Sequence, residues 1–284
     1  MKTILVPTDF SKNSINAIDY AVALAKKENA KIILLNGFHI GIGTPDISGQ
    51  LYSDMLDKKR KEVNKKLHAL CVEITESKKV KCAYVSKFDL AVDAILETII
   101  ETKPDLVIMG TRGVSTIKEV LMGNNTVKII EKATCPVIAV PEVARFEGIK
   151  KITYATDYHA SDIDALKKLV EIAKLFNARI SVLHVSDEEF DRYSEETYLN
   201  EFKNIVKKKI RYDKIIYKLA YGKQLEKILD EEIKKSPPDL LAMSTQHRNL
   251  IEKLFETSVT QKMAFHSEVP LMAFHHKKES EVFV

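Results

Sequence analysis

The chain has 284 residues, enough for two domains of ordinary size, and 45% of them are hydrophobic, so each half can bury a substantial core. The 44 basic and 40 acidic side chains are well mixed, and a net charge of +4 gives no electrostatic case for a nucleic-acid-binding protein. No window is long and apolar enough for a membrane span, nothing at the start resembles a signal peptide, and three cysteines without a CxxC spacing or an even count indicate reduced thiols, so we expect a cytoplasmic protein.

The first half alternates short apolar runs with amphipathic segments. The apolar runs predict strands at 2–7, 31–38, 80–85, 105–109 and 135–140. Helices are predicted between them: one carries Ile15, Ile18, Val22 and Ala25 on one face, two others lie at about 51–76 and 90–101, and one follows residue 126. The strands contain few polar positions, as parallel strands covered on both faces do. The alternation therefore predicts a parallel sheet with right-handed crossovers and helices on both faces.

The second half repeats the first. Residues 152–157 repeat 4–9, and residues 179–185 repeat 31–37, both at an offset of 148. Residues 238–243 match 104–109, and 269–274 match 135–140, now at an offset of 134. The second copy is thus 14 residues shorter (148 minus 134), and the loss falls between its second and fourth strands. We predict two copies of one domain, at 1–143 and 149–278, joined by a short link.

The stretch from Met109 to Thr126 follows a predicted buried strand and contains Gly110, Gly113 and Gly123. A strand, a glycine turn and a helix start bring backbone N–H groups together near a positive helix end, where a phosphate can bind. The alternative is that Gly110 and Gly113 only permit a tight turn and that Gly123 ends a short helix. The spacing by itself leaves both interpretations open.

These residues resemble the universal stress protein family in its tandem form, over essentially the whole chain. The resemblance rests on VPTDFS at 6–11, DLVIMG at 105–110 and CPV at 135–137. Its most specific element is a glycine, two residues, a glycine, nine residues and a third glycine, the spacing of Gly110, Gly113 and Gly123. It implies an α/β fold of two doubly wound domains, each a five-stranded parallel sheet of order 3-2-1-4-5 of the adenine-nucleotide α-hydrolase-like type. It also implies ATP, with Mg²⁺, at the carboxyl ends of the strands.

The resemblance assigns roles to residues at two strand ends. Pro7, Thr8 and Asp9 would lie beside the adenosine, with Asp9 on a ribose hydroxyl or on a nucleotide-bound Mg²⁺. The alternative role of Asp9 is to cap the first helix. Met109 would pack on the nucleoside, although a Met closing a buried strand is often plain core. Arg112 would pair with phosphate oxygens, or it is a solvated loop charge.

The glycines and the helix start form the rest of the predicted site. Gly110 and Gly113 would let the backbone approach the ribose and phosphates, because a Cβ there would occupy ligand space. N–H groups and a hydroxyl would come from the helix start, at Gly123, Asn124, Asn125 and Thr126.

Several positions depart from the family pattern. Asn124 replaces Ser or Thr after the third glycine, and Gly37 stands near the adenine where Val is common. In the second domain the places of all three glycines are taken by other residues, Ser244, His247 and Thr257. Ser258 aligns with Asn124. Because the second copy is built without these glycines, we infer that the fold does not require them and that in the first domain they contact a ligand.

The resemblance implies a stress-response protein in which ATP is a regulatory or conformational ligand of the N-terminal domain, with little or no hydrolysis. The alternative is an ATP-independent interaction module, or a binder of another small ligand, with a degenerate C-terminal site. We find no catalytic residues and no motif for nucleophilic catalysis, so an enzyme would be at most a slow ATPase. The final strands at 137–140 and 271–274 are expected to form an intramolecular pseudo-dimer, and a homodimer is left open.

Overall fold

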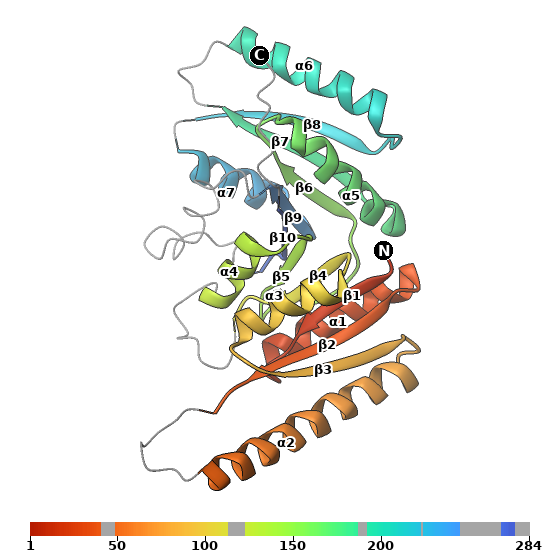
Figure 1. The fold of residues 1–284 in the computed structure, drawn as a ribbon. Helices are drawn as coiled ribbons and strands as arrows, with labels where there is room; N and C mark the ends of the chain where they lie inside the picture. The colour runs from red at the N-terminus through yellow and green to blue at the C-terminus, as the bar shows by residue number, and fades with distance from the viewer. Residues whose placement is uncertain (41–48, 113–122, 187–191, 223, 245–267, 276–284) are drawn as a thin grey trace. The chain divides into compact units, whose positions relative to one another are not determined.

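The computed structural model describes residues 1–40, 49–112, 123–186, 192–222, 224–244 and 268–275 (Figure 1). These residues divide into two compact units, the first within 1–140 and the second from 141 onward. Each unit is an α/β fold, as predicted, and each is described separately below.

The first unit is a parallel sheet in the order β3-β2-β1-β4-β5 with helices in its crossovers. Its strands are β1 (Thr3–Pro7), β2 (Lys31–Phe38), β3 (Cys82–Phe88), β4 (Leu106–Gly110) and β5 (Val137–Val140). Its helices are α1 (Lys12–Glu28), α2 (Gly49–Glu76), α3 (Ala91–Thr102) and α4 (Asn124–Lys132). The predicted order is confirmed. The third strand was predicted to end too early, because its register with β2 continues to the pair Phe38 and Phe88.

The second unit repeats this topology, with the strand order β10-β9-β6-β7-β8 among its described residues. Its strands are β6 (Lys151–Ala155), β7 (Arg179–Ser186), β8 (Ile215–Tyr221), β9 (Leu240–Ser244) and β10 (Leu271–Phe274). Its helices are α5 (Ala160–Phe176), α6 (Arg192–Lys209) and α7 (Leu225–Lys235). The expected pairing of the two final strands stays a prediction.

The inner strands are buried on both faces, which is why they consist of nearly continuous apolar runs. In the first unit Leu5, Val107 and Ile108 are fully buried, and in the second unit Tyr154 and Ala242 are. The crossover helices cover the faces of each sheet and leave its carboxyl edge to the loops. Among the described helices none is long and apolar enough to cross a membrane.

Candidate functional site

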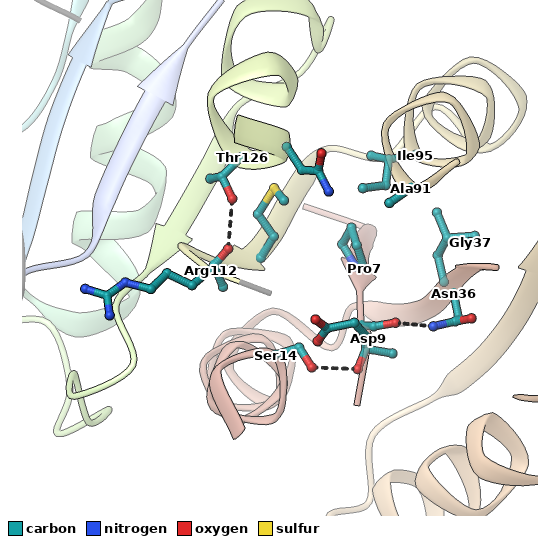
Figure 2. Close-up of a pocket in the computed structure, with 14 residues that line it drawn as sticks. Pro7, Asp9, Ser14, Asn36, Gly37, Ala91, Ile95, Arg112 and Thr126 are labelled. Carbon is teal, nitrogen blue, oxygen red and sulfur yellow. Dashed lines mark hydrogen bonds between the residues drawn. The ribbon is translucent and has the colours of Figure 1, made fainter. Parts of the chain in front are cut away.

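A pocket opens at the carboxyl ends of β1, β2 and β4 in the first unit (Figure 2). It holds about 550 Å³ of empty space, which includes space open to solvent. Strand ends, two loops and the N-terminal parts of α1, α3 and α4 contribute its lining: Pro7, Thr8, Asp9, Ser14, Leu35, Asn36, Gly37, Ala91, Ile95, Met109, Gly110, Arg112, Asn125 and Thr126.

Most of the residues predicted from the sequence line this pocket. They are Pro7, Thr8, Asp9, Gly37, Met109, Gly110, Arg112, Asn125 and Thr126. Gly123 and Asn124 stand at the start of α4 without lining it, and Gly113 lies outside the described residues. The sequence interpretation missed five lining residues: Ser14, Leu35, Asn36, Ala91 and Ile95. The signal that could have found Leu35 and Asn36 is their place at the end of a parallel strand next to the first.

Thr8 is held in place by the fold. Its backbone N–H donates to the Leu35 carbonyl (2.8 Å), and its own carbonyl accepts from Asn36 Nδ2 (2.7 Å). The Thr8 hydroxyl lies 2.9 Å from the Ser14 hydroxyl and accepts from the Phe10 N–H at 3.0 Å. Phe10 has a left-handed φ of 64°, so the loop turns sharply after Asp9. The end of β1 is therefore a rigid wall of the pocket.

Asp9 supports the turn that precedes α1. Its Oδ1 atom accepts a hydrogen bond from the Ser11 N–H at 3.0 Å, two residues on. The cap of α1 is Ser11, whose side chain accepts from the Ser14 N–H at 3.2 Å. The alternative role of Asp9 as the helix cap is therefore wrong. Asp9 brings a carboxylate to the pocket wall.

Two glycines of the pocket are required by helix packing. A Cβ at Gly110 would lie 2.8 Å from Asn13 Cγ and 3.1 Å from the Asn13 backbone carbon, in α1. A Cβ at Gly37 would lie 2.9 Å from Ala94 Cβ, in α3. The inference that the fold does not require Gly110 is therefore wrong, while contact of this glycine with a ligand stays a prediction. Both glycines set how closely a helix approaches the strand ends.

The start of α4 offers fewer free donors than predicted. The Gly123 N–H donates to the Thr111 carbonyl (2.6 Å), and the Thr126 N–H donates to the Gly123 carbonyl (2.9 Å). The Thr126 hydroxyl donates to the carbonyls of Gly110 (3.1 Å) and Thr111 (3.3 Å). Within the described part of the chain, the N–H groups of Asn124 and Asn125 make no hydrogen bond. Both residues stand in the first turn of α4, at its positive end, where an anion is stabilised.

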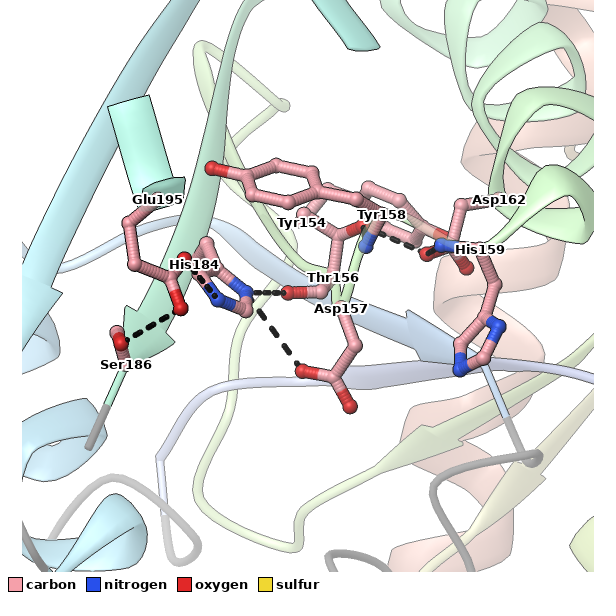
Figure 3. A network of polar contacts seen from close by, with 9 residues as sticks. All are labelled: Tyr154, Thr156, Asp157, Tyr158, His159, Asp162, His184, Ser186 and Glu195. Carbon is pink, nitrogen blue, oxygen red and sulfur yellow. Dashed lines mark hydrogen bonds and ion pairs between the residues drawn. The ribbon is translucent and has the colours of Figure 1, made fainter. Parts of the chain in front are cut away.

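The corresponding place in the second unit contains a network of charged side chains (Figure 3). The buried Asp162 carboxylate accepts from the Tyr154 hydroxyl (2.7 Å), the Thr156 hydroxyl (2.6 Å) and the His159 N–H (3.2 Å). Burial, together with the Asp162 charge, raises the pKa of Tyr154 well above its usual value. Tyr154 is therefore a neutral donor.

His184 joins this loop to α6. Its Nδ1 lies 2.7 Å from the Thr156 carbonyl, and its Nε2 lies 3.3 Å from Glu195 Oε2. Glu195 is buried and also accepts from the Ser186 hydroxyl at 2.9 Å. The hydroxyl and the carbonyl of Thr156 are thus both hydrogen-bonded to side chains, those of Asp162 and His184. Of the residues expected to replace the glycines, Ser244 ends β9 and is buried, while His247, Thr257 and Ser258 lie outside the described residues.

Comparison with known proteins identifies both halves as similar to one family. Residues 1–141 and 148–275 each match the model of the Universal stress protein family. Universal stress protein YxiE of Bacillus subtilis is 31% identical over 48% of this chain and 97% of its own. The crystal structure of a universal stress protein from Archaeoglobus fulgidus has a TM-score of 0.70 and 17% identity over 97% of both chains. Another solved universal stress protein is a complex with cAMP; it is 26% identical, covers 49% of this chain and 96% of its own, and has a TM-score of 0.36.

Proposed function

The chain belongs to the universal stress protein family as a tandem two-domain member, and we propose that its first unit binds ATP at the carboxyl ends of β1, β2 and β4. In this proposal ATP is a conformational ligand and is hydrolysed slowly or not at all. The observation that carries the proposal is the convergence of most of the predicted nucleotide-binding residues on one pocket, which has apolar walls and lies beside the N-terminal end of α4.

The apolar part of the pocket fits a nucleoside. Leu35, Ile95 and Met109 offer flat apolar surface for a base, and Gly37 leaves the end of β2 without a side chain. The Asp9 carboxylate accepts from a ribose hydroxyl or contacts the Mg²⁺ that accompanies the nucleotide. The apolar side chains and the carboxylate thus match the base and the ribose hydroxyl groups of adenosine.

The polar rim fits the phosphates. The N–H groups of Asn124 and Asn125 lie at the positive end of α4. Arg112 also lines the pocket, but Figure 2 shows its guanidinium directed away from the other lining side chains, so it would have to turn to pair with a phosphate. Bound Mg²⁺ would neutralise part of the phosphate charge. Among the described lining residues Asp9 is the one carboxylate, and there is no histidine. A single acidic group that is already engaged with the Ser11 N–H is a poor general base, which supports slow turnover.

Calorimetric titration with Mg–ATP tests the proposal, using matched variants at equivalent positions of the two units. Asp9→Ala removes the carboxylate of the pocket, and we expect it to weaken ATP binding by about tenfold or more, the effect of losing roughly 1.4 kcal/mol. Asp157→Ala makes the same change in the second unit and should leave the affinity unchanged. Folded wild-type protein that takes up no ATP at millimolar concentration would refute the proposal, as would equal losses in the two variants.

The alternative is that the first unit binds another small ligand or serves assembly without ATP. Gly37 and Asn124 favour it, because both depart from the family pattern at positions near the base and the phosphates. Mass spectrometry of small molecules released by denaturing the purified protein separates the two. Recovery of an adenine nucleotide supports the proposal, whereas a different recovered compound supports the alternative.

A further inference from the structure

The fold brings together two cysteines that the sequence spacing did not pair. Cys71 lies on α2 and Cys82 is the first residue of β3, and both thiols are half-buried. Cys135, the third cysteine, is buried just before β5. All three cysteines belong to the first unit.

Contacts along α2 define how this helix is aligned on β3, which it accompanies in Figure 1. The Ser86 hydroxyl donates to Asn64 Oδ1 at 2.7 Å, and the rings of His68 and Tyr84 meet edge to face with their centroids 6.0 Å apart. Each advance of about one helical turn on α2 therefore matches a step of two residues back along β3. One turn of helix rises about 5.4 Å and two strand residues span about 6.6 Å, so the steps are of similar length.

The next step of this alignment pairs Cys71 with Cys82. Residues 64, 68 and 71 share one face of a helix, and residues 82, 84 and 86 share one face of a strand. The electrostatic environment agrees with this proximity, because burial and the adjacent Cys71 thiol raise the pKa of the Cys82 thiol. Cys82 therefore stays protonated, and Cys71 is the member of the pair expected to react first.

We propose that Cys71 and Cys82 are a peroxide-sensitive thiol pair that closes to a disulfide between α2 and β3. The Cys71 sulfur attacks one oxygen of hydrogen peroxide as its thiol proton leaves; the O–O bond breaks, Cys71 becomes a sulfenic acid, and the departing hydroxide takes up the proton as the first water. The Cys82 sulfur then loses its proton and attacks the sulfenic sulfur; the S–S bond forms, the S–O bond breaks, and the departing hydroxide takes up that proton as the second water. Two thiols are oxidised by two electrons, and one hydrogen peroxide is reduced to two waters.

The bond would fasten an edge strand to the helix that covers it. α2 packs on β3, and β3 is the outer strand of the first unit. The disulfide would close a loop of about a dozen residues, which restricts the unfolded chain. In the second unit Ile215 begins β8 at the position of Cys82, and that unit contains no cysteine, so it is an internal reference for oxidation.

Peptide mapping of the full-length protein tests the proposal. Reduced protein is treated with hydrogen peroxide, free thiols are alkylated and the chain is digested with trypsin, which cuts after Lys78 and Lys81 and so separates the two cysteines. We expect one linked pair of peptides carrying Cys71 and Cys82 from a monomeric chain, with Cys135 alkylated. Recovery of both cysteines alkylated or individually oxidised, or a link between chains, would overturn the proposal.

Thermal unfolding gives a second measurement. Oxidation should raise the melting temperature of the wild type by about 5 °C or more, and dithiothreitol should reverse the rise. Cys71→Ser and Cys82→Ser should each abolish the rise, while Cys135→Ser should retain it. A rise that survives in Cys71→Ser would contradict this assignment. The mapping of the wild type decides the question even where a variant folds poorly.

Discussion

The loops after β1 and β6 have the same backbone form but are supported by different side chains. Asn36 Nδ2 and His184 Nδ1 each lie 2.7 Å from the carbonyl of the loop threonine, Thr8 or Thr156. Phe10 and Tyr158 both have left-handed φ values, 64° and 62°. An amide in one unit and an imidazole in the other thus make the same hydrogen bond.

The difference between the loops is one of charge. The Thr8 hydroxyl meets the neutral Ser14, whereas the Thr156 hydroxyl donates to the buried Asp162 carboxylate. In both units the hydroxyl of the loop threonine accepts from the N–H two residues on, so this threonine supports the turn and is by itself a weak sign of a ligand. The surroundings distinguish the units: a pocket with apolar walls in the first, and a network of ionisable groups in the second.

Ser14 and Asp162 are the equivalent partners of the two threonine hydroxyls, and replacing each by alanine should give the largest difference in stability between the two loops. Asp162→Ala leaves the Tyr154 hydroxyl, the Thr156 hydroxyl and the His159 N–H without their acceptor, so we expect a loss of about 3–5 kcal/mol in the free energy of unfolding. Ser14→Ala removes one neutral partner and should cost about 1 kcal/mol. Urea unfolding, with hydrogen exchange to locate the change, measures both. Equal losses would mean that the two loops are supported alike.

Gly110→Ala tests whether packing explains the glycine at the end of β4. The added methyl group would meet Asn13, so we expect a loss of about 1–3 kcal/mol. The double variant Asn13→Ala/Gly110→Ala removes the obstructing side-chain atoms and should recover part of that loss relative to Asn13→Ala alone. Ser244→Ala, at the equivalent position, is the control and should change stability less. An undisturbed Gly110→Ala protein would restore ligand contact as the reason for this glycine.

A carboxylate at the opposite edge of the sheet should act alike in both units. Asp105 Oδ2 accepts from the N–H groups of Lys2 (2.6 Å) and Thr3 (2.9 Å), as Asp239 does from those of Lys150 (2.7 Å) and Lys151 (2.8 Å). Burial opposes ionisation of Asp105, but these hydrogen bonds outweigh it and lower its pKa. Its ionised form therefore stabilises the fold above the usual carboxyl pKa, and this contribution disappears as the pH falls through the lowered value.

We expect Asp105→Asn to cost about 1 kcal/mol at pH 7, a modest effect because the carboxylate is exposed. The difference from the wild type should shrink in unfolding measurements as the pH is lowered from 7 through the lowered pKa of Asp105. A difference that does not change with pH would show that the charge of Asp105 contributes nothing.

The sequence determined the elements and their repetition, because strand and helix periodicities are local. Thr8, Asp9 and Met109 were placed in one candidate site by the resemblance to the universal stress protein family, in agreement with the rule that the carboxyl ends of parallel strands meet at one edge of the sheet. The repeat at offsets of 148 and 134 predicted two copies of one topology.

Only the tertiary structure decided which side chains meet across those elements. Asn13 lies far from Gly110 in sequence, and Ile95 reaches the pocket from α3 whereas Met109 stands on β4. The alignment of α2 on β3, which brings Cys71 towards Cys82, follows from packing contacts that no spacing rule encodes. Local sequence patterns determine where helices and strands begin and end. Contacts between segments that are distant in sequence determine which side chains fit at a given position, as at Gly110 beside Asn13.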